Sequence, residues 1–157
     1  MATGGVLGNG TKAAYSITSP LSWVNVPALV DISVPTYVAD KVNIDTHSVS
    51  NNLHKNMAGM ITVGDPGFTV LADFDPATSA AQAYLRAANK AGTSLWFRFE
   101  IPTNRAKTLF WGVEFKATVL SDEPAVPIAD KQTRRFNLSF DGDAIYDDAA
   151  AGASEIS

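Results

Sequence analysis

The strongest constraint on the fold is a strict alternation of residue types in two neighbouring stretches, LWFRFEI (95–101) and LFWGVEFKATV (109–119). Side chains at positions i and i+2 of a β-strand point to the same side of a sheet. Each stretch therefore predicts a strand with one apolar face and one polar face. The residues between them, 102–107, are typical of a turn. Together the two stretches predict an amphipathic hairpin whose polar face contacts water.

Further segments follow the same period and predict a mainly β domain. Alternating runs lie at 11–17, 23–34, 38–45, 67–74 and 135–140. Pro27 has no backbone N–H to donate, so the run that contains it is either an edge strand or is interrupted there. About seven strands in this arrangement predict an antiparallel β-sandwich or partly open barrel.

One segment predicts a short helix, from about residue 76 to residue 91, that flanks the sheet. Asp75 is a good N-cap, and Pro76 suits the first helical position. Lys90 lies near the negative end of the helix dipole, and Gly92 is a suitable residue to end the helix. Apolar residues at helical spacing predict one buried stripe, formed by Ala77, Ala80, Ala81, Tyr84, Leu85 and Ala88.

Other segments show neither period. Residues 1–10 contain four glycines and no charge, which predicts an N-terminal arm that is loose in the isolated chain. Residues 46–60 are polar and predict a long loop, and residues 121–130, with two prolines, predict another. Residues 143–157 predict an acidic, mobile C-terminal tail. The expected organisation is a single domain, 11–142, between two terminal arms.

Composition excludes several classes of protein. The 157 residues include no cysteine, so disulfides, thiolate metal ligands and cysteine nucleophiles are excluded. The net charge of −4 is uneven: residues 1–140 hold all twelve Lys and Arg against eleven Asp and Glu, whereas residues 141–157 hold five acids and no base. A nearly neutral body without a basic stripe argues against a sequence-reading nucleic-acid binder. No apolar run reaches the roughly 20 residues of a membrane span.

Candidate catalytic and metal-binding groups do not form a recognisable set. Asp45, His47 and Ser48 are close in sequence, but adjacent residues on an extended chain point to opposite sides, so His47 and Ser48 would not converge. Asp45, His47 and His54 lack the spacing of a known metal site. The sequence therefore predicts no catalytic residue, no metal and no cofactor, and favours a protein that is not an enzyme.

A loose apolar arm, a long polar loop and open sheet edges favour a protein that assembles with copies of itself. Open edges present unpaired N–H and C=O groups that proteins must cover. A head-to-tail ring pairs each edge with its neighbour, and arms or loops can then join one ring to the next. The residues expected to make these contacts are Val6, Leu7, His47, Asn51, Asn52, His54, Lys55, Met57 and Met60.

From about residue 30 to residue 142, the order of elements resembles the major tail tube proteins of long-tailed, non-contractile bacteriophages (siphophages). The motifs that carry the resemblance follow one another along the chain. They are the polar loop through Gly59, GDPGFTV (64–70), the helix from Pro76, LWFRFEIP (95–102), FWGVEFKATV (110–119) and KQTRRFNLSFDG (131–142).

The resemblance implies a structural virion protein made in the cytoplasm of the host bacterium. Its subunits would form hexameric rings, each subunit giving a sheet to a continuous inner barrel, and the rings would stack into a tube that conducts the genome into the host. Other tail proteins would bind the two ends of the tube. We expect the polar hairpin face, with Arg98, Glu100, Glu114 and Lys116, to face the channel. A bore that is not basic suits DNA that must slide, because basic residues would hold its phosphates.

Two alternatives remain open. A tail terminator or head-to-tail joining protein of similar fold would form single rings that do not elongate. A monomeric β-barrel that binds a small apolar ligand would need a hollow core. Phe97, Phe99, Trp111 and Phe115 are bulky and are expected to fill that core instead.

Overall fold

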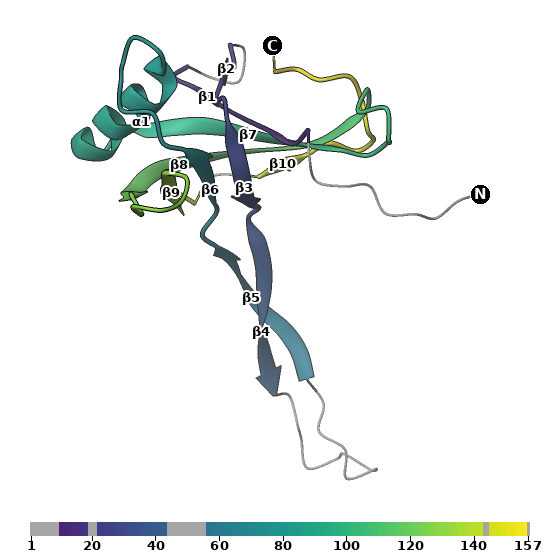
Figure 1. Cartoon of the computed structure of the whole chain (residues 1–157). Coiled ribbons are helices and arrows are strands. Elements are labelled where there is room, and N and C mark those ends of the chain that lie inside the picture. The colour runs from purple at the N-terminus through teal and green to yellow at the C-terminus, as the bar shows by residue number, and fades with distance from the viewer. Residues whose placement is uncertain (1–9, 19–21, 44–55, 143–144, 157) are drawn as a thin grey trace, which may run out of the picture.

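The computed structural model describes residues 10–18, 22–43, 56–142 and 145–156. In chain order its elements are β1 (Lys12–Ser16), β2 (Val24–Asn25), β3 (Leu29–Ser33), β4 (Thr36–Asn43), β5 (Asn56–Gly64), β6 (Gly67–Leu71), α1 (Ala80–Ala91), β7 (Ser94–Pro102), β8 (Phe110–Ala125), β9 (Thr133–Phe140) and β10 (Tyr146–Asp147). The main sheet is antiparallel, with strand order β2-β1-β7-β8-β9-β6-β3 and β10 paired to β8. β4 and β5 form a second, two-stranded sheet (Figure 1). The prediction of a mainly β, antiparallel fold with one helix is confirmed.

The hairpin predicted from the two alternating stretches is formed by β7 and β8, which pair from Ser94 opposite Thr118 to Pro102 opposite Phe110. β8 continues well beyond this hairpin and pairs with β9 as far as Ala125. The prediction of a loop at 121–130 is therefore wrong for residues 121–125. Pro124 suggested a loop, but it lies in the last rungs of the ladder, where a missing donor is tolerated.

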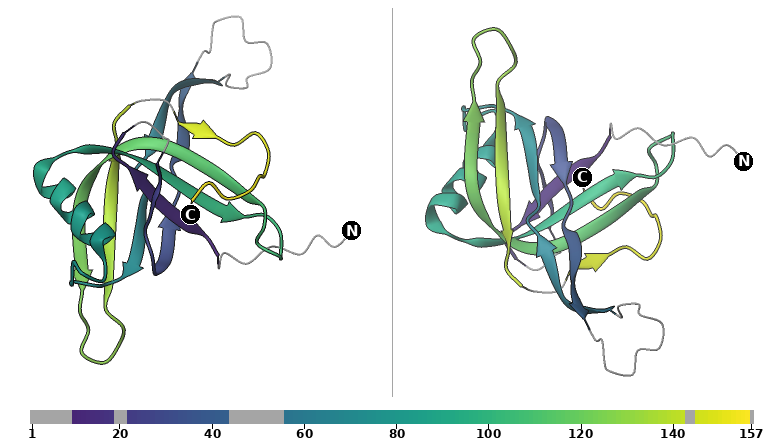
Figure 2. Two further views of the ribbon diagram at one scale, coloured as in Figure 1. Left: turned by 90° about the horizontal axis from the view of Figure 1, so that it is seen from above. Right: turned by 90° about the horizontal axis from the view of Figure 1, so that it is seen from below.

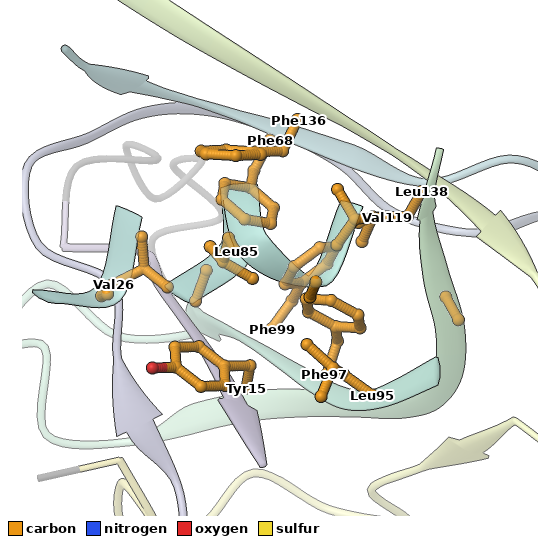
Figure 3. Packing of buried hydrophobic residues seen from close by; sticks show 14 of the residues in the cluster. Tyr15, Val26, Phe68, Leu85, Leu95, Phe97, Phe99, Val119, Phe136 and Leu138 are labelled. Atoms are coloured by element: carbon orange, nitrogen blue, oxygen red, sulfur yellow. The ribbon is translucent and has the colours of Figure 1, made fainter. Parts of the chain in front are cut away.

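The core lies inside the curved main sheet, where Phe68 of β6 contacts Phe97 and Phe99 of β7, and α1 packs against it (Figure 3). Phe97, Phe99 and Phe115 are fully buried, as the alternation predicted. Phe99 and Phe115 meet edge to face with ring centroids 5.2 Å apart, and Phe68 packs on Phe136 at 5.4 Å. Offset and edge-to-face contacts at these distances are the arrangements that buried aromatic side chains prefer. This packing argues against the hollow barrel that a small-ligand carrier would need.

The helix begins later than predicted. Asp75 and Pro76 start a separate turn, in which Asp75 Oδ1 accepts from the N–H of Ala77 at 2.9 Å. The Asp75 carbonyl accepts from the N–H of Ser79 at 2.9 Å, and Ser79 is the N-cap of α1. The C-terminal end is as predicted, because Gly92 adopts the left-handed conformation with φ of 69°.

The buried face of α1 contains a glutamine that the apolar stripe did not predict. Ala81, Leu85 and Ala88 are buried as expected, and Gln82 is buried with them. Gln82 Nε2 donates to the carbonyl of Leu71 at 2.8 Å, while its Oε1 accepts from the N–H of Asp73 at 3.0 Å. The side chain thereby satisfies one backbone group in the last residue of β6 and one just after that strand. Ala77 and Ala80 were predicted to belong to the buried stripe, but both are exposed.

The run at 23–34 is broken at Pro27, one of the two outcomes predicted. It forms β2 and β3, which lie at opposite ends of the main sheet. Ala28 follows Pro27 with φ of 59°, which redirects the chain. The polar stretch 46–60 is not irregular throughout, because residues 56–60 belong to β5. The remainder of that predicted loop, 46–55, lies outside the described residues.

Candidate functional site

The β4–β5 hairpin, called the arm below, projects away from the main sheet (Figure 1). Ala39 lies opposite Ile61, and Val42 lies opposite Met57, so each pair shares one face of the arm. Tyr37 lies on the first face and Val38 on the second, because strand residues alternate. All of these side chains are exposed, and that of Met60 is 78% exposed.

Apolar side chains on both faces make the arm a candidate site of interaction. A two-stranded hairpin on its own is marginally stable in water. Contiguous exposed apolar surface on a folded protein usually marks a contact with another protein. Because both faces are apolar, covering only one of them would leave the other in water.

Two prolines lie where the arm joins the main sheet. Pro35 separates β3 from β4, and Pro66 separates β5 from β6. The ladder between the strands ends with Ser33 opposite Gly67 and resumes with Thr36 opposite Gly64. Proline has no N–H and a fixed φ, so it interrupts a ladder at a defined place. The arm therefore continues the β3–β6 pair beyond an interruption of the ladder, and a proline marks that interruption on each strand.

The main sheet is open in the described part of the chain. Its order ends at β2 on one side and at β3 on the other. Edge strands present backbone donors and acceptors that can pair with another chain. Val30 on β3 also exposes its side chain at this edge. Both edges are thus surfaces on which a second copy could continue the sheet.

Arg98 on β7 is the centre of a buried ionic cluster. Its side chain is 2% exposed. Nη1 lies 2.7 Å from Glu114 Oε1, and Nη2 lies 3.0 Å from Asp148 Oδ2 and 3.3 Å from Glu100 Oε2. Gly112 leaves room for the guanidinium, because a Cβ there would lie 2.5 Å from Arg98 Cζ. A glycine within a strand often marks such a close approach.

Burial and neighbouring charges shift the pKa values of Glu114 and Arg98 in opposite directions. Burial raises the pKa of Glu114, and this effect exceeds the lowering by the Arg98 guanidinium. For Arg98, burial disfavours the charged form, but the hydrogen bond and charge of Asp148, with the charges of Glu100 and Glu155, raise its pKa. Arg98 therefore stays protonated and can hold several carboxylates together.

The segment 145–156 lies over this cluster. β10 pairs with β8 at Glu114 and Val113, and Gly152 exchanges two backbone hydrogen bonds with Phe110, of 2.7 and 3.0 Å. The Glu100 carboxylate, fully buried, accepts from the Ser154 hydroxyl at 2.7 Å and from the N–H groups of residues 155 and 156 at 3.1 and 3.2 Å. The prediction of a mobile tail is wrong for residues 145–156, because they are bound to β7 and β8 by these contacts.

The chain is similar to chains of several solved structures. The tail of an empty gene transfer agent particle with C6 symmetry matches with a TM-score of 0.68 at 12% identity, over 91% of this chain and 98% of that chain. The SPP1 tail tube matches with a TM-score of 0.66 at 14% identity, over 97% of this chain and 81% of that one. A chain of the six-fold symmetrised baseplate of the anti-feeding prophage matches with a TM-score of 0.67 at 11% identity, over 93% of this chain and 97% of that one.

The chain has the fold of a tail tube protein. At 11–14% identity the likeness is one of fold, and it confirms at that level the resemblance seen in the sequence. No protein-family model and no curated protein sequence matches the chain.

The predicted contact residues of this tail tube fold are only partly described. Met57 and Met60 lie on β5, in the arm, with exposed side chains. The others lie outside the described residues: Val6, Leu7, His47, Asn51, Asn52, His54 and Lys55. Sequence reasoning missed Tyr37, Val38 and Ile61, which extend the exposed apolar surface of the arm. Their alternation was visible, but nothing local indicated that both faces of the hairpin would be uncovered.

The predicted wet face of the β7–β8 hairpin needs correction. Arg98 and Glu100 are buried beneath the segment 145–156, and Glu114 and Lys116 are half-buried. The polar pattern suggested exposure, whereas the covering groups come from about fifty residues later in the chain. Whether this part of the tail tube fold faces a channel stays a prediction.

The described residues contain no group of three or more His, Asp or Glu placed to hold a metal ion. The candidates Asp45, His47, Ser48 and His54 lie outside them. Of the helical segments placed by the structure, none has the length and apolar character required to cross a bilayer.

Proposed function

We propose that this protein is the subunit of a siphophage tail tube. Its copies form hexameric rings, and the rings stack into a tube that conducts the genome into the host bacterium. The observation that carries the proposal is the projecting arm with apolar side chains on both faces, in a chain with the tail tube fold. Such an arm requires a partner, and the similar gene transfer agent tail has C6 symmetry.

The open edges at β2 and β3 support the same proposal. In a head-to-tail ring, each edge lies beside the opposite edge of the next subunit, and strand pairing there would satisfy backbone groups left unpaired in one subunit. A single-ring terminator or joining protein of similar fold would use the same edges. The arm favours the tube, because it extends well beyond the main sheet and can reach a second ring.

The finer parts of the proposal concern location and cargo. The protein would be made in the host cytoplasm and reside in the virion, with other tail proteins bound at the two ends of the tube. DNA would pass without sequence-specific contacts. The hairpin face with Arg98, Glu100, Glu114 and Lys116 is our candidate for the lumen side, with Glu114 and Lys116 the less covered pair.

Assembly of the purified protein tests the proposal. Size-exclusion chromatography with light scattering, followed by negative-stain electron microscopy, should show tubes. Met57→Asp places a charge on one apolar face of the arm and should abolish tubes while circular dichroism shows an unchanged fold. Ala106→Asp makes the same change on the exposed β7–β8 turn, outside the arm, and is the matched control.

A wild-type protein that stays monomeric at high concentration would refute the proposal. Single rings that never elongate would favour the terminator alternative. Normal tubes from Met57→Asp would show that this face of the arm is not a contact between subunits.

A further inference from the structure

The hairpin connecting β8 and β9 ends in an exposed apolar tip. β8 and β9 remain paired up to Ala125 opposite Thr133, and the tip follows at residues 126–129. Val126 is 58% exposed and Ile128 is 106% exposed, so Ile128 has essentially no neighbour in the described structure. Pro127 between them restricts the backbone, which limits the ways in which the tip can fold back to cover its own apolar side chains.

The base of this hairpin is firmly held, so the tip is presented in a defined direction. Arg134 on β9 donates to Asp122 on β8 through Nε at 2.6 Å and through Nη2 at 2.7 Å, a bidentate pair. The carbonyl of Gln132 accepts from the N–H of Ala72 at 3.0 Å. Beyond these contacts the hairpin points away from α1 and from the rest of the sheet (Figure 2).

A cavity of about 290 Å³ lies between α1 and the segment that follows β6. Its apolar lining comes from Phe74 and Pro76 on one side and from Ala83 and Ala87 of α1 on the other. Its charged lining consists of Arg86, Lys90 and Arg134, with Asp73 as the one acid. Arg86 and Lys90 are exposed, and Arg86 Nε lies 3.8 Å from Asp122 Oδ2. The cavity can therefore receive an aliphatic side chain at its apolar wall while offering positive charge to flanking carboxylates.

The tip carries more acids than bases, with Lys131 as its exposed base, whereas the cavity lining carries more bases than acids. Glu123 and Asp130 flank the apolar tip and are exposed. Asp122, the third acid of the hairpin, is already paired with Arg134. An approaching tip would thus bring Glu123 and Asp130 toward Arg86 and Lys90, and electrostatic complementarity of this kind selects and orients a partner.

We propose that the β8–β9 tip of one copy inserts Ile128 into the α1 cavity of another copy. The tip and the cavity are different surfaces, so the contact is head-to-tail and repeats around a ring or along a stack. This inference rests on the proposed self-assembly and adds to it a specific contact that involves neither the arm nor the sheet edges.

Cross-linking between copies tests the contact directly, because the chain has no cysteine of its own. Ile128→Cys and Ala87→Cys proteins are mixed, assembled and mildly oxidised. A disulfide forms only where the Cα atoms come within about 7 Å, so a cross-linked dimer should appear in the mixture. Neither variant should cross-link alone, nor should Ala87→Cys with Ala106→Cys. Dimers from Ala87→Cys mixed with Met57→Cys would assign the cavity to the arm and overturn the proposal.

Ile128→Asp provides the second readout. It should raise the protein concentration needed for assembly by at least about tenfold, because an apolar contact is lost at every repeat. Lys131→Gln, on the same exposed loop, should change it little. If wild-type tubes form but Ile128→Asp assembles normally and no cross-link appears, the tip contact is wrong and the tube proposal stands. If the wild type never assembles, both fail.

Discussion

Gly112 gives the sharpest test of the buried ionic cluster. An added Cβ would lie 2.5 Å from Arg98 Cζ and 2.8 Å from Nη1, and it would also meet Nη2. The guanidinium would have to move, although its surroundings leave it only 2% exposed. Moving it lengthens the bonds to Glu114 and Glu100 within the β7–β8 hairpin and the bond to Asp148, which ties the segment 145–156 to that hairpin.

Disrupting one partner of a buried ion pair costs about 3–5 kcal/mol. Some relaxation of Arg98 reduces this figure, and replacing a strand glycine otherwise contributes about 0.5–1 kcal/mol in favour of alanine. We therefore expect Gly112→Ala to lower the free energy of unfolding by roughly 2–4 kcal/mol. Gly152→Ala is the matched control, because a Cβ there has no atom within 4 Å, and it should be nearly neutral.

Urea unfolding of four proteins distinguishes a loss of stability that arises from the collision with Arg98 from a general intolerance of alanine at position 112. The set is the wild type, Gly112→Ala, Arg98→Met and the double variant. If the loss arises from the collision with the guanidinium, Gly112→Ala should cost less than about 0.5 kcal/mol once Arg98 is methionine, a strongly non-additive result. An equal cost in both backgrounds would refute the explanation.

Two further changes probe Glu114 of the same cluster and the buried amide of Gln82. Because burial raises the pKa of Glu114 above its ordinary 4.5, its protonated form is favoured by folding. Relative to Glu114→Gln, the free energy of unfolding of the wild type should therefore fall as the pH rises from below 4.5 through the raised pKa. Urea unfolding of both proteins across this pH range tests the sign. A relative free energy that rises with pH would contradict the reasoning. Gln82→Leu leaves the Leu71 carbonyl and the Asp73 N–H without their partner and should cost about 1–3 kcal/mol in urea unfolding, and a neutral result would contradict the bridging role.

The alternation of residue types was sufficient to predict the strands, but not to predict which distant segments pack on them. The alternation at 95–101 and 109–119 depends on residues two apart, and it correctly predicted β7, the first part of β8 and the buried phenylalanines. The position of Gly92 likewise predicted the end of α1. These features follow from neighbours in the sequence.

The errors arise where distant segments meet. Arg98 and Glu100 read as an exposed face because their alternation is the same whether water or protein covers them. The cover is a segment rich in alanine whose composition predicts no structure, and it is held by Glu100, more than fifty residues earlier. Asp148 had no local pattern that could reveal its role. The sequence could therefore not show which polar residues form the cluster.

The long strand β8 has a mechanical consequence. Its first part pairs with β7 and its second part with β9, with only Ala117 and Thr118 shared by both ladders and a register shift just after Val119. The two portions of the sheet are therefore linked by an unbroken run of peptide bonds as well as by side-chain packing. Opening the two portions like a hinge about β8 would separate Phe68 from Phe97 and Phe99, whose ring centroids lie 6.4 and 6.1 Å from it, so these rings act as the latch of the fold.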